Sequence, residues 1–183
     1  RTSEASNAVS KIFSSEAGVE LRLEEQNQKW VFQYGAQTTE TPIQMSHNTW
    51  AALAVVLDTD SNRLCLYFDG KPVYSAPLQH TAIDDSPLYL LPDAKGVRID
   101  EVRIWDCALT YQEIADNTRY YLSGKEDGLL CYYTFDNVQK YTQKSTTFYH
   151  ISNMAYNAAN YVERNDIVLD AAQADIRIDG IPS

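Results

Sequence analysis

The feature that most constrains the fold is the regular alternation, along the chain, of short strand-like runs with turn residues. Residues 18–25 alternate apolar and charged side chains, which is typical of a half-buried antiparallel strand. Asp69-Gly70 is a strong hairpin signal, because both residues tolerate positive φ. Further runs rich in apolar, β-branched and aromatic residues recur at roughly eight- to twelve-residue intervals: 30–34, 50–57, 63–68, 71–74 and 129–135. This pattern predicts an all-β fold, a two-sheet antiparallel sandwich.

One short capped helix is predicted near residues 111–122. Thr110 and Glu113 have the spacing of a capping box, in which each side chain satisfies the backbone N–H of the other. Gly124 stands just past the predicted end, where a C-terminal cap is common. Four side chains are expected to face inward: Ile114, Ala115, Thr118 and Tyr121.

The strand pattern weakens after Asp136, where the chain becomes polar and rich in Asn, Thr and Tyr. We therefore expect residues 1–136 to form the sandwich. Residues 137–183 are expected to be either an irregular C-terminal extension or closing strands of the same sandwich. Short strands are predicted at 166–170 and 174–179.

Charge argues against several classes of partner. The 183-residue chain has a formal net charge of −10, and its basic residues do not cluster. Such a chain is repelled by nucleic acid and by anionic membrane surfaces, so neither is expected as the main partner. The longest apolar run, residues 50–57, is far too short to insert across a bilayer.

The three cysteines leave two alternatives open. Cys65, Cys107 and Cys131 are too few for a full disulfide framework and lack the spacing of a zinc site. They are either ordinary small buried residues or one disulfide with a thiol left over.

Asp100 and Glu101 are adjacent carboxylates in front of a strand-like run. Neighbouring strand residues point to opposite faces, so these two cannot both flank one glycosidic bond. Asp100 is in phase with Val102 and Ile104, which suggests an inward-facing carboxylate. Structural hydrogen bonding, calcium ligation and catalysis are the alternatives for it, in that order. No motif for an activated nucleophile occurs, and no catalytic residue is assigned.

Asp58, Asp60 and Asn62 have the oxygen spacing that begins an EF-hand loop. The sixth position is Arg63 instead of glycine, and the flanking runs are strand-like, so a hairpin loop is favoured. Asp58 and Asp60 stay, with Asp100, as candidate ligands of a structural calcium.

Aromatic residues supply the candidate ligand contacts. The chain has thirteen Tyr and three Trp, and such rings can stack on sugars or pack in a core. Trp30, Tyr34 and Tyr74 are the candidate sugar-binding residues, with core packing as the alternative for each. Trp50 and Trp105 are expected in the core.

Five segments in order resemble a known family. They read HNTWAALAVV (47–56), LCLYFDG (64–70), DEVRIWD (100–106), ALTYQEI (108–114) and SGKEDGLLCYYTFD (123–136). Over about residues 10–136 the chain resembles the laminin-G-like and pentraxin-like jelly rolls of the concanavalin A-like lectin/glucanase superfamily, in versions found in large bacterial surface or secreted proteins. The resemblance implies a jelly-roll sandwich whose first strand lies upstream of Arg1.

The sequence also departs from this family. The acidic calcium loop of pentraxins would fall between Leu91 and Val97, where only Pro92-Asp-Ala-Lys-Gly96 is found. The E-x-D-x-x-E strand motif of the superfamily's glucanases is absent. Fold family alone does not fix function.

Three functions therefore remain. The first is a non-catalytic binding module for carbohydrate, at the cell surface or outside the cell, as part of a longer exported chain. The second is a structural or protein-interaction domain that spaces or docks neighbouring domains. The third is a glycoside-acting enzyme, which requires paired carboxylates on one face.

Overall fold

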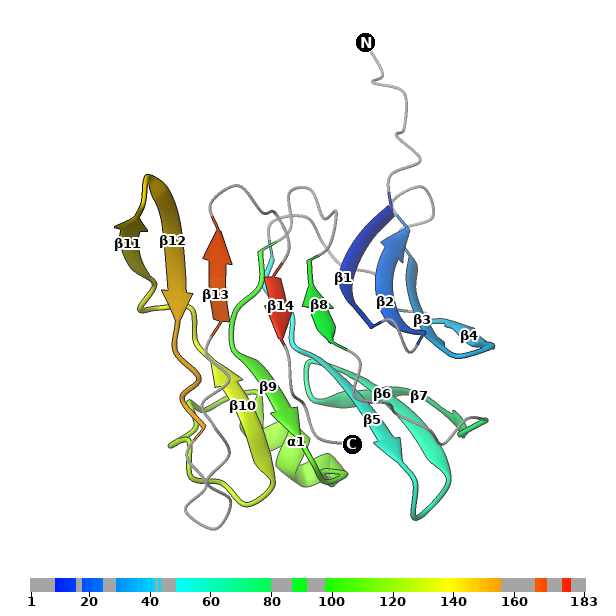
Figure 1. Ribbon diagram of the computed structural model, residues 1–183. Helices are drawn as coiled ribbons and strands as arrows, with labels where there is room; N and C mark the ends of the chain where they lie inside the picture. Colours follow the sequence, from blue (N-terminus) through cyan, green and yellow to red (C-terminus); the bar gives the residue numbers. More distant parts are fainter. Residues whose placement is uncertain are drawn as a thin grey trace.

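The computed structural model describes residues 9–15, 18–24, 29–41, 43, 49–79, 87–91, 98–155, 167–170 and 176–178. Within these ranges the regular structure is β-strand apart from one short helix, and every strand pairing is antiparallel (Figure 1). The largest sheet has six strands, in the spatial order β14 (Ile176–Ile178), β8 (Leu88–Leu90), β1 (Val9–Ser15), β2 (Val19–Glu24), β3 (Lys29–Tyr34) and β4 (Gln37–Glu40).

Three smaller sheets complete the described strands. One joins β5 (Leu53–Asp58), β6 (Arg63–Phe68) and β7 (Lys71–Pro77), and another pairs β9 (Val102–Trp105) with β10 (Leu129–Tyr133). The third joins β11 (Gln139–Gln143), β12 (Thr146–Ile151) and β13 (Ile167–Asp170). The helix α1 (Tyr111–Asn117) lies between β9 and β10 in sequence. The predicted all-β sandwich is confirmed.

The first hydrophobic core lies between the six-stranded sheet and β5–β7. The side chains of β3 dominate it, because Trp30, Phe32 and Tyr34 share one face of that strand and all are buried. Leu64 and Leu66 of β6 meet them, and Leu64 has no exposed surface. This contact joins the two sheets face to face.

The second core gathers around β10. Cys131 and Tyr133 project from β10 and are almost completely buried. They pack with Leu90 of β8, Ile151 of β12 and Ile167 of β13. Strands from three different sheets are therefore held together here.

Several local predictions are confirmed. Asp69 and Gly70 have φ values of 48° and 73°, as a tight hairpin between β6 and β7 requires. The short strands predicted at 166–170 and 174–179, where the sequence pattern is weak, are present as β13 and β14.

The β11–β12 hairpin, by contrast, was not predicted. All five β11 side chains are exposed, so the strand has no apolar face to reveal it. Its turn, Lys144-Ser145, has φ values of 46° and 69° without the usual glycine or asparagine.

The predicted helix 111–122 is too long. The helix ends at Asn117, and Thr118 is its C-cap. Ile114 is buried as expected, but Thr118 is exposed and Tyr121 is 79% exposed. The expectation that both face inward is wrong, because the chain has left the helix before Tyr121.

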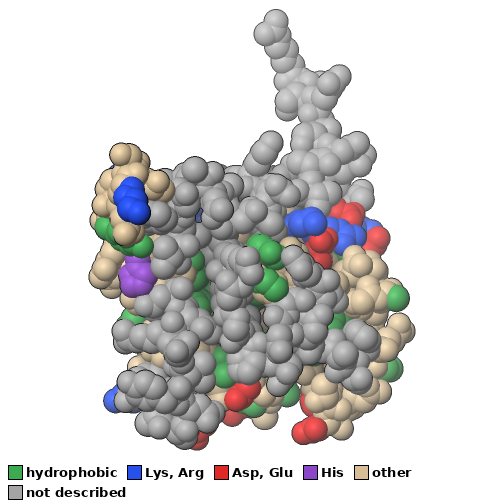
Figure 2. Space-filling model, in the orientation of Figure 1, with side chains coloured by type: hydrophobic (Ala, Val, Ile, Leu, Met, Phe, Trp, Pro, Cys, Tyr) green, Lys and Arg blue, Asp and Glu red, His purple; other side chains and the backbone are tan. Residues whose placement is uncertain are grey.

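The outer face of the six-stranded sheet carries paired charges. Arg22 lies between Glu20 and Glu24, at 3.1 and 3.2 Å, and Lys11 reaches Glu20 at 3.0 Å. Figure 2 shows these basic and acidic side chains intermixed over β1 and β2. The polar positions of β2 therefore form an ion-pair network facing solvent.

All three cysteines are free thiols, so the disulfide alternative is not observed. Cys131 is buried and Cys65 half-buried, whereas Cys107 is exposed. Burial raises the pKa of the Cys131 thiol, which keeps it protonated and inert. No helix in the described part of the chain combines the length and apolar character that crossing a bilayer requires.

Candidate binding site

Two of the three predicted sugar-binding aromatics lie inside the protein. The side chains of Trp30 and Tyr34 are 3% and 1% exposed and belong to the first core. Neither ring has a face open to a ligand, so the structure corrects this expectation in favour of core packing. Tyr74, on β7, is half-buried and packs against the same core. Its role in ligand binding stays a prediction.

Asp58 closes the turn between β5 and β6. Its Oδ1 accepts the N–H groups of Asp60 and Ser61, both at 3.0 Å, and its Oδ2 accepts the Ser61 hydroxyl. The hydrogen bond from the Ser61 side chain holds the pKa of Asp58 below its ordinary value, with the backbone N–H of Ser61 adding to it. The geometry is that of a hairpin loop in which the Asp58 carboxylate serves the backbone.

Asp60 is exposed in the same turn. Across the described ranges, no three His, Cys, Asp or Glu side chains group as a metal site would. The structural calcium stays a prediction.

A hollow of about 360 Å³ lies where loops from four strands meet. Its walls come from the residue after β8, the loop before β5, the segment before β9 and the segment after β10. The lining residues are Trp50, Leu91, Arg98, Ile99, Asp100, Thr134, Phe135 and Asp136. We call this the Trp50 hollow.

Trp50 is an exposed aromatic ring in this hollow. Its side chain is 66% exposed, and it precedes β5, which begins only at Leu53. The expectation that Trp50 lies in the core is therefore wrong. Trp105, also expected in the core, is half-buried on β9. An exposed indole beside polar groups is typical of a ligand-contact surface.

The apolar part of the hollow is fixed to both cores. Leu91 packs against the first core, and Ile99 and Phe135 pack against the second. The rings of Phe135 and Tyr133 lie 6.3 Å apart. The hollow therefore has a floor that is anchored in the packed interior.

Three non-glycine residues at the hollow or beside it have left-handed backbone. The φ values are 52° for Leu91, 57° for Phe135 and 55° for Glu101. This conformation costs free energy for residues with a Cβ and concentrates at functional sites. The strain identifies the loops around the Trp50 hollow as a candidate site.

The polar part of the hollow carries one cation and two anions. Arg98, Asp100 and Asp136 all have exposed side chains. Within the ranges that the structure describes, none of the three takes part in an ion pair. Their exposure leaves all three side chains accessible to a ligand from solvent.

Asp100 does not face inward, as its phase with Val102 and Ile104 had suggested. It lies before β9, is exposed, and accepts the N–H of Glu101 at 2.9 Å. The left-handed turn at Glu101 breaks the alternation on which that expectation depended.

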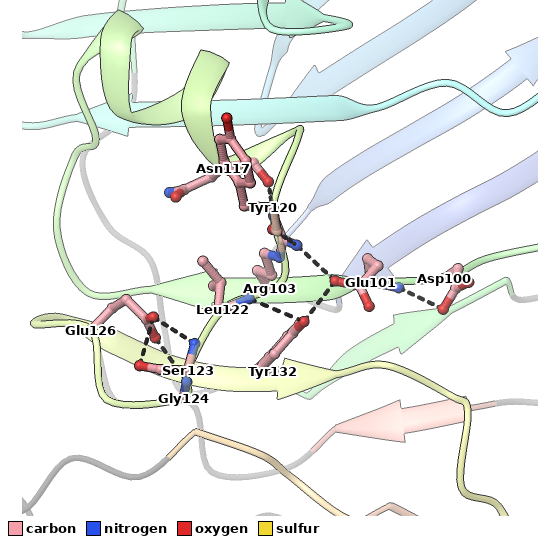
Figure 3. A network of polar contacts seen from close by, with 10 residues as sticks. All are labelled: Asp100, Glu101, Arg103, Asn117, Tyr120, Leu122, Ser123, Gly124, Glu126 and Tyr132. Carbon is pink, nitrogen blue, oxygen red and sulfur yellow. Dashed lines mark hydrogen bonds and ion pairs between the residues drawn. The ribbon is translucent and has the colours of Figure 1, made fainter.

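Behind the hollow, Glu101 anchors a polar network between β9 and β10 (Figure 3). Its Oε2 accepts Arg103 Nη2 at 2.6 Å and the Tyr132 hydroxyl at 2.8 Å. The Arg103 guanidinium also lies over the Tyr132 ring, 5.3 Å from its centroid. Burial raises the pKa of Tyr132, and the hydrogen bond to Glu101 adds to that shift.

Arg103 also explains why α1 ends early. Its Nη1 donates to the carbonyl of Asn117, and its Nη2 donates to the carbonyl of Tyr120 at 3.0 Å (Figure 3). The side chain of a strand residue thus caps carbonyls that a longer helix would use internally. One guanidinium thus joins the end of α1 to Glu101, the residue next to Asp100.

Sequence reasoning missed Trp50, Arg98 and Asp136 as site residues. One signal was available for Trp50, because the aromatic residue stands at the loop end of its apolar run. Arg98 and Asp136 carry no such signal, since only the fold brings residues 98–100 and 134–136 together.

The comparisons with known proteins agree with this architecture. The family model described as the concanavalin A-like lectin/glucanases superfamily matches residues 1–115, which include Trp50, Arg98 and Asp100. No curated protein matches the chain.

Among solved structures, the chain is similar to a candidate carbohydrate-binding protein from Bacteroides ovatus ATCC 8483. The TM-score is 0.56 at 15% identity, over 93% of this chain and 47% of that one. The chain thus spans about half the length of that protein, and the likeness concerns the fold.

Proposed function

Because the chain belongs to the concanavalin A-like lectin/glucanase superfamily, we propose that it is a non-catalytic carbohydrate-binding module whose ligand occupies the Trp50 hollow. The observation that carries the proposal is the 66% exposed indole of Trp50 in a hollow that also holds Arg98 and Asp100. The hollow is open to solvent, so a ligand would be bound from one side.

The lining suits the two sides of a sugar ring. The face of an indole can pack against the apolar C–H face of a sugar ring. The hydrogens of the sugar C–H groups carry a partial positive charge, which the negative π-face of the indole attracts. Carboxylates accept hydrogen bonds from sugar hydroxyls, and a guanidinium donates them. Trp50 supplies the stacking surface, while Arg98, Asp100 and Asp136 supply the polar contacts.

The carboxylates of the hollow suit binding better than glycoside hydrolysis. A glycosidase keeps one carboxyl protonated as a general acid, usually by burying it in an apolar setting. Asp100 and Asp136 are both exposed, and the nearby Glu101 is in an ion pair with Arg103. A module without catalytic activity is therefore the proposal.

The test is a binding screen against soluble cello-, malto-, xylo-, manno- and galacto-oligosaccharides, followed by calorimetry on the tightest binder. We expect Trp50→Ala to lose at least about tenfold in affinity, which corresponds to roughly 1.4 kcal/mol. Tyr121→Ala is the matched control, because Tyr121 is 79% exposed and does not line the hollow. Equal affinity of Trp50→Ala and wild type would place the site elsewhere.

A protein-interaction or spacing role is the second candidate. It is favoured by β11, whose side chains are all exposed, and by Tyr120 and Tyr121, which are 69% and 79% exposed. A folded chain that binds none of the oligosaccharides but associates with domains of its own parent protein would support this role.

An extracellular location within a longer exported bacterial chain rests on the family resemblance alone. A structural calcium rests on the oxygen spacing of Asp58 and Asp60 and on the carboxylate of Asp100. Both stay proposals. Repeating the binding screen in calcium and in a chelator tests the second.

A further inference from the structure

We infer that Glu101 is a positioning residue that orients Asp100 for ligand binding in the Trp50 hollow. The inference rests on the proposed function and adds a residue that does not itself line the hollow. It is carried by the chain of contacts that leads from α1 to Asp100 (Figure 3).

The first step is the link between the two neighbours. The backbone N–H of Glu101 donates to Asp100 Oδ1 at 2.9 Å. Glu101 has φ 55°, which sets how its side chain lies relative to the peptide plane that carries this N–H. Among the residues that the structure describes, Asp100 Oδ1 is the oxygen that the protein engages, and Oδ2 is the atom that we assign to the ligand.

The second step is what holds Glu101 in that conformation. Its carboxylate accepts charge-assisted hydrogen bonds from Arg103 at 2.6 Å and from the Tyr132 hydroxyl at 2.8 Å. The side chains of Glu101 and Arg103 are only 27% and 15% exposed, so water competes weakly for these bonds. These bonds, together with the hydrogen bond from the Glu101 N–H to Asp100, offset the cost of the left-handed backbone.

The third step is the rigidity of the anchor. Tyr132 is 2% exposed on β10, and its hydroxyl also accepts the N–H of Leu122 at 3.3 Å. Arg103 is bound to the carbonyls of Asn117 and Tyr120 at the end of α1. Glu101 is thus fixed to two strands and to the helix end, and it transmits that order to Asp100. A preorganised carboxylate binds with a smaller loss of conformational entropy.

A double-mutant cycle on affinity tests the inference. The four proteins are wild type, Glu101→Gln, Asp100→Asn and the double variant, and the probe is the oligosaccharide of the panel that wild type binds most tightly. If Glu101 acts through Asp100, Glu101→Gln weakens binding by about fivefold in wild type and by less than about twofold in Asp100→Asn. Equal losses in both backgrounds would overturn it.

A matched control separates positioning from general stability. Glu126 also accepts backbone N–H bonds, from Ser123 at 2.7 Å and Gly124 at 2.9 Å, but it does not line the hollow. Glu126→Gln should leave affinity unchanged. If Glu101→Gln fails to fold, judged by circular dichroism, Tyr132→Phe replaces it in the same cycle.

The outcomes distinguish the two proposals. Binding by wild type with additive losses rejects the positioning role and leaves the carbohydrate site intact. Absence of binding to every oligosaccharide by folded wild type rejects both.

Discussion

Single residues in this protein serve more than one element, and Tyr132 is the clearest case. Its ring is buried between strands, its hydroxyl donates to Glu101, and the same oxygen accepts the Leu122 N–H. Phenylalanine in this position would remove one of the two donors to the Glu101 carboxylate and the acceptor of the Leu122 N–H.

We expect Tyr132→Phe to destabilise the fold by about 2 kcal/mol, because a hydrogen bond to a partly buried carboxylate is lost. Urea denaturation followed by circular dichroism measures this. Tyr120→Phe is the control, since Tyr120 is 69% exposed and should stay within about 0.5 kcal/mol of wild type. A Tyr132→Phe midpoint equal to that of the control would mean that the hydroxyl contributes nothing.

At this scale the sequence predicts residue chemistry better than residue location. Trp30 and Trp50 both begin apolar runs, yet one is 3% and the other 66% exposed. Trp30 shares the one signal that Trp50 carries, a place at the loop end of its run, so that signal does not tell the two apart. What decides is which sheet covers each ring, and that is a property of strands distant in sequence.

At the scale of elements, the start of α1 is a local structure and was predicted correctly. The capping box is complete, with Glu113 N–H donating to Thr110 Oγ1 at 3.3 Å and Thr110 N–H donating to Glu113 Oε2 at 2.7 Å. The hydrogen bond from the Thr110 side chain lowers the pKa of Glu113 from its ordinary value of 4.5, and the bond from the Thr110 backbone N–H adds to the shift.

This lowered pKa gives stability a defined dependence on pH. The folded pKa of Glu113 is below the unfolded one, so its contribution is present above about pH 4.5 and is lost as pH falls through the folded value. We expect Glu113→Gln to melt at a slightly lower temperature than wild type at neutral pH and to match it in strong acid. Thermal melts at several pH values measure the gap, and a gap independent of pH would exclude the charge as its origin.

The segment after α1 depends on a close approach at Gly124. A Cβ there would lie 2.1 Å from the Met154 carbonyl oxygen, and φ is +82°. Gly18 also has positive φ, at +84°, but its Cβ would meet nothing closer than 3.6 Å. A side chain at Gly18 would therefore meet backbone strain alone, whereas a side chain at Gly124 would meet both backbone strain and a steric conflict.

We expect Gly18→Ala to cost about 1 kcal/mol, from the left-handed backbone alone. Gly124→Ala should cost clearly more, about 3 kcal/mol or above, because the conflict is with backbone that cannot rotate away. Chemical denaturation of both variants compares them. Equal costs would show that the Met154 segment moves aside easily.

Element boundaries were predictable where the signal is local and failed where it is not. Thr110 and Glu113 mark the start of α1 by themselves. Its end is set by Arg103, which precedes the helix in sequence and reaches it only through the fold. Gly124 does not terminate the helix, which ends at Asn117, and lies instead where the backbone passes close to Met154.

At the scale of the whole molecule, charge should shape ligand choice. The chain carries a formal −10, and the Trp50 hollow holds one guanidinium against two carboxylates. A ligand with a carboxylate would therefore meet net repulsion as it approaches and as it binds.

We expect an uncharged oligosaccharide to bind at least about threefold more tightly than its uronic acid counterpart. Repulsion between the ligand carboxylate and one net negative charge about 6 Å away in water would produce a difference of this size. The preference should shrink in about 1 M salt, where the Debye length is about 3 Å, and in Asp136→Asn. Calorimetry with both sugars measures it. Tighter binding of the uronic acid would show that Arg98 outweighs the carboxylates.

The place of β14 has a consequence for how the protein is made. β8 lies between β1 and β14, so residues from opposite ends of the described chain complete one sheet. During synthesis β1 and β8 can pair early, but β8 keeps an open hydrogen-bonding edge until residues 176–178 leave the ribosome. An exposed edge of this kind is a site where nascent chains associate wrongly. The interval between these two events is when a chaperone would matter most.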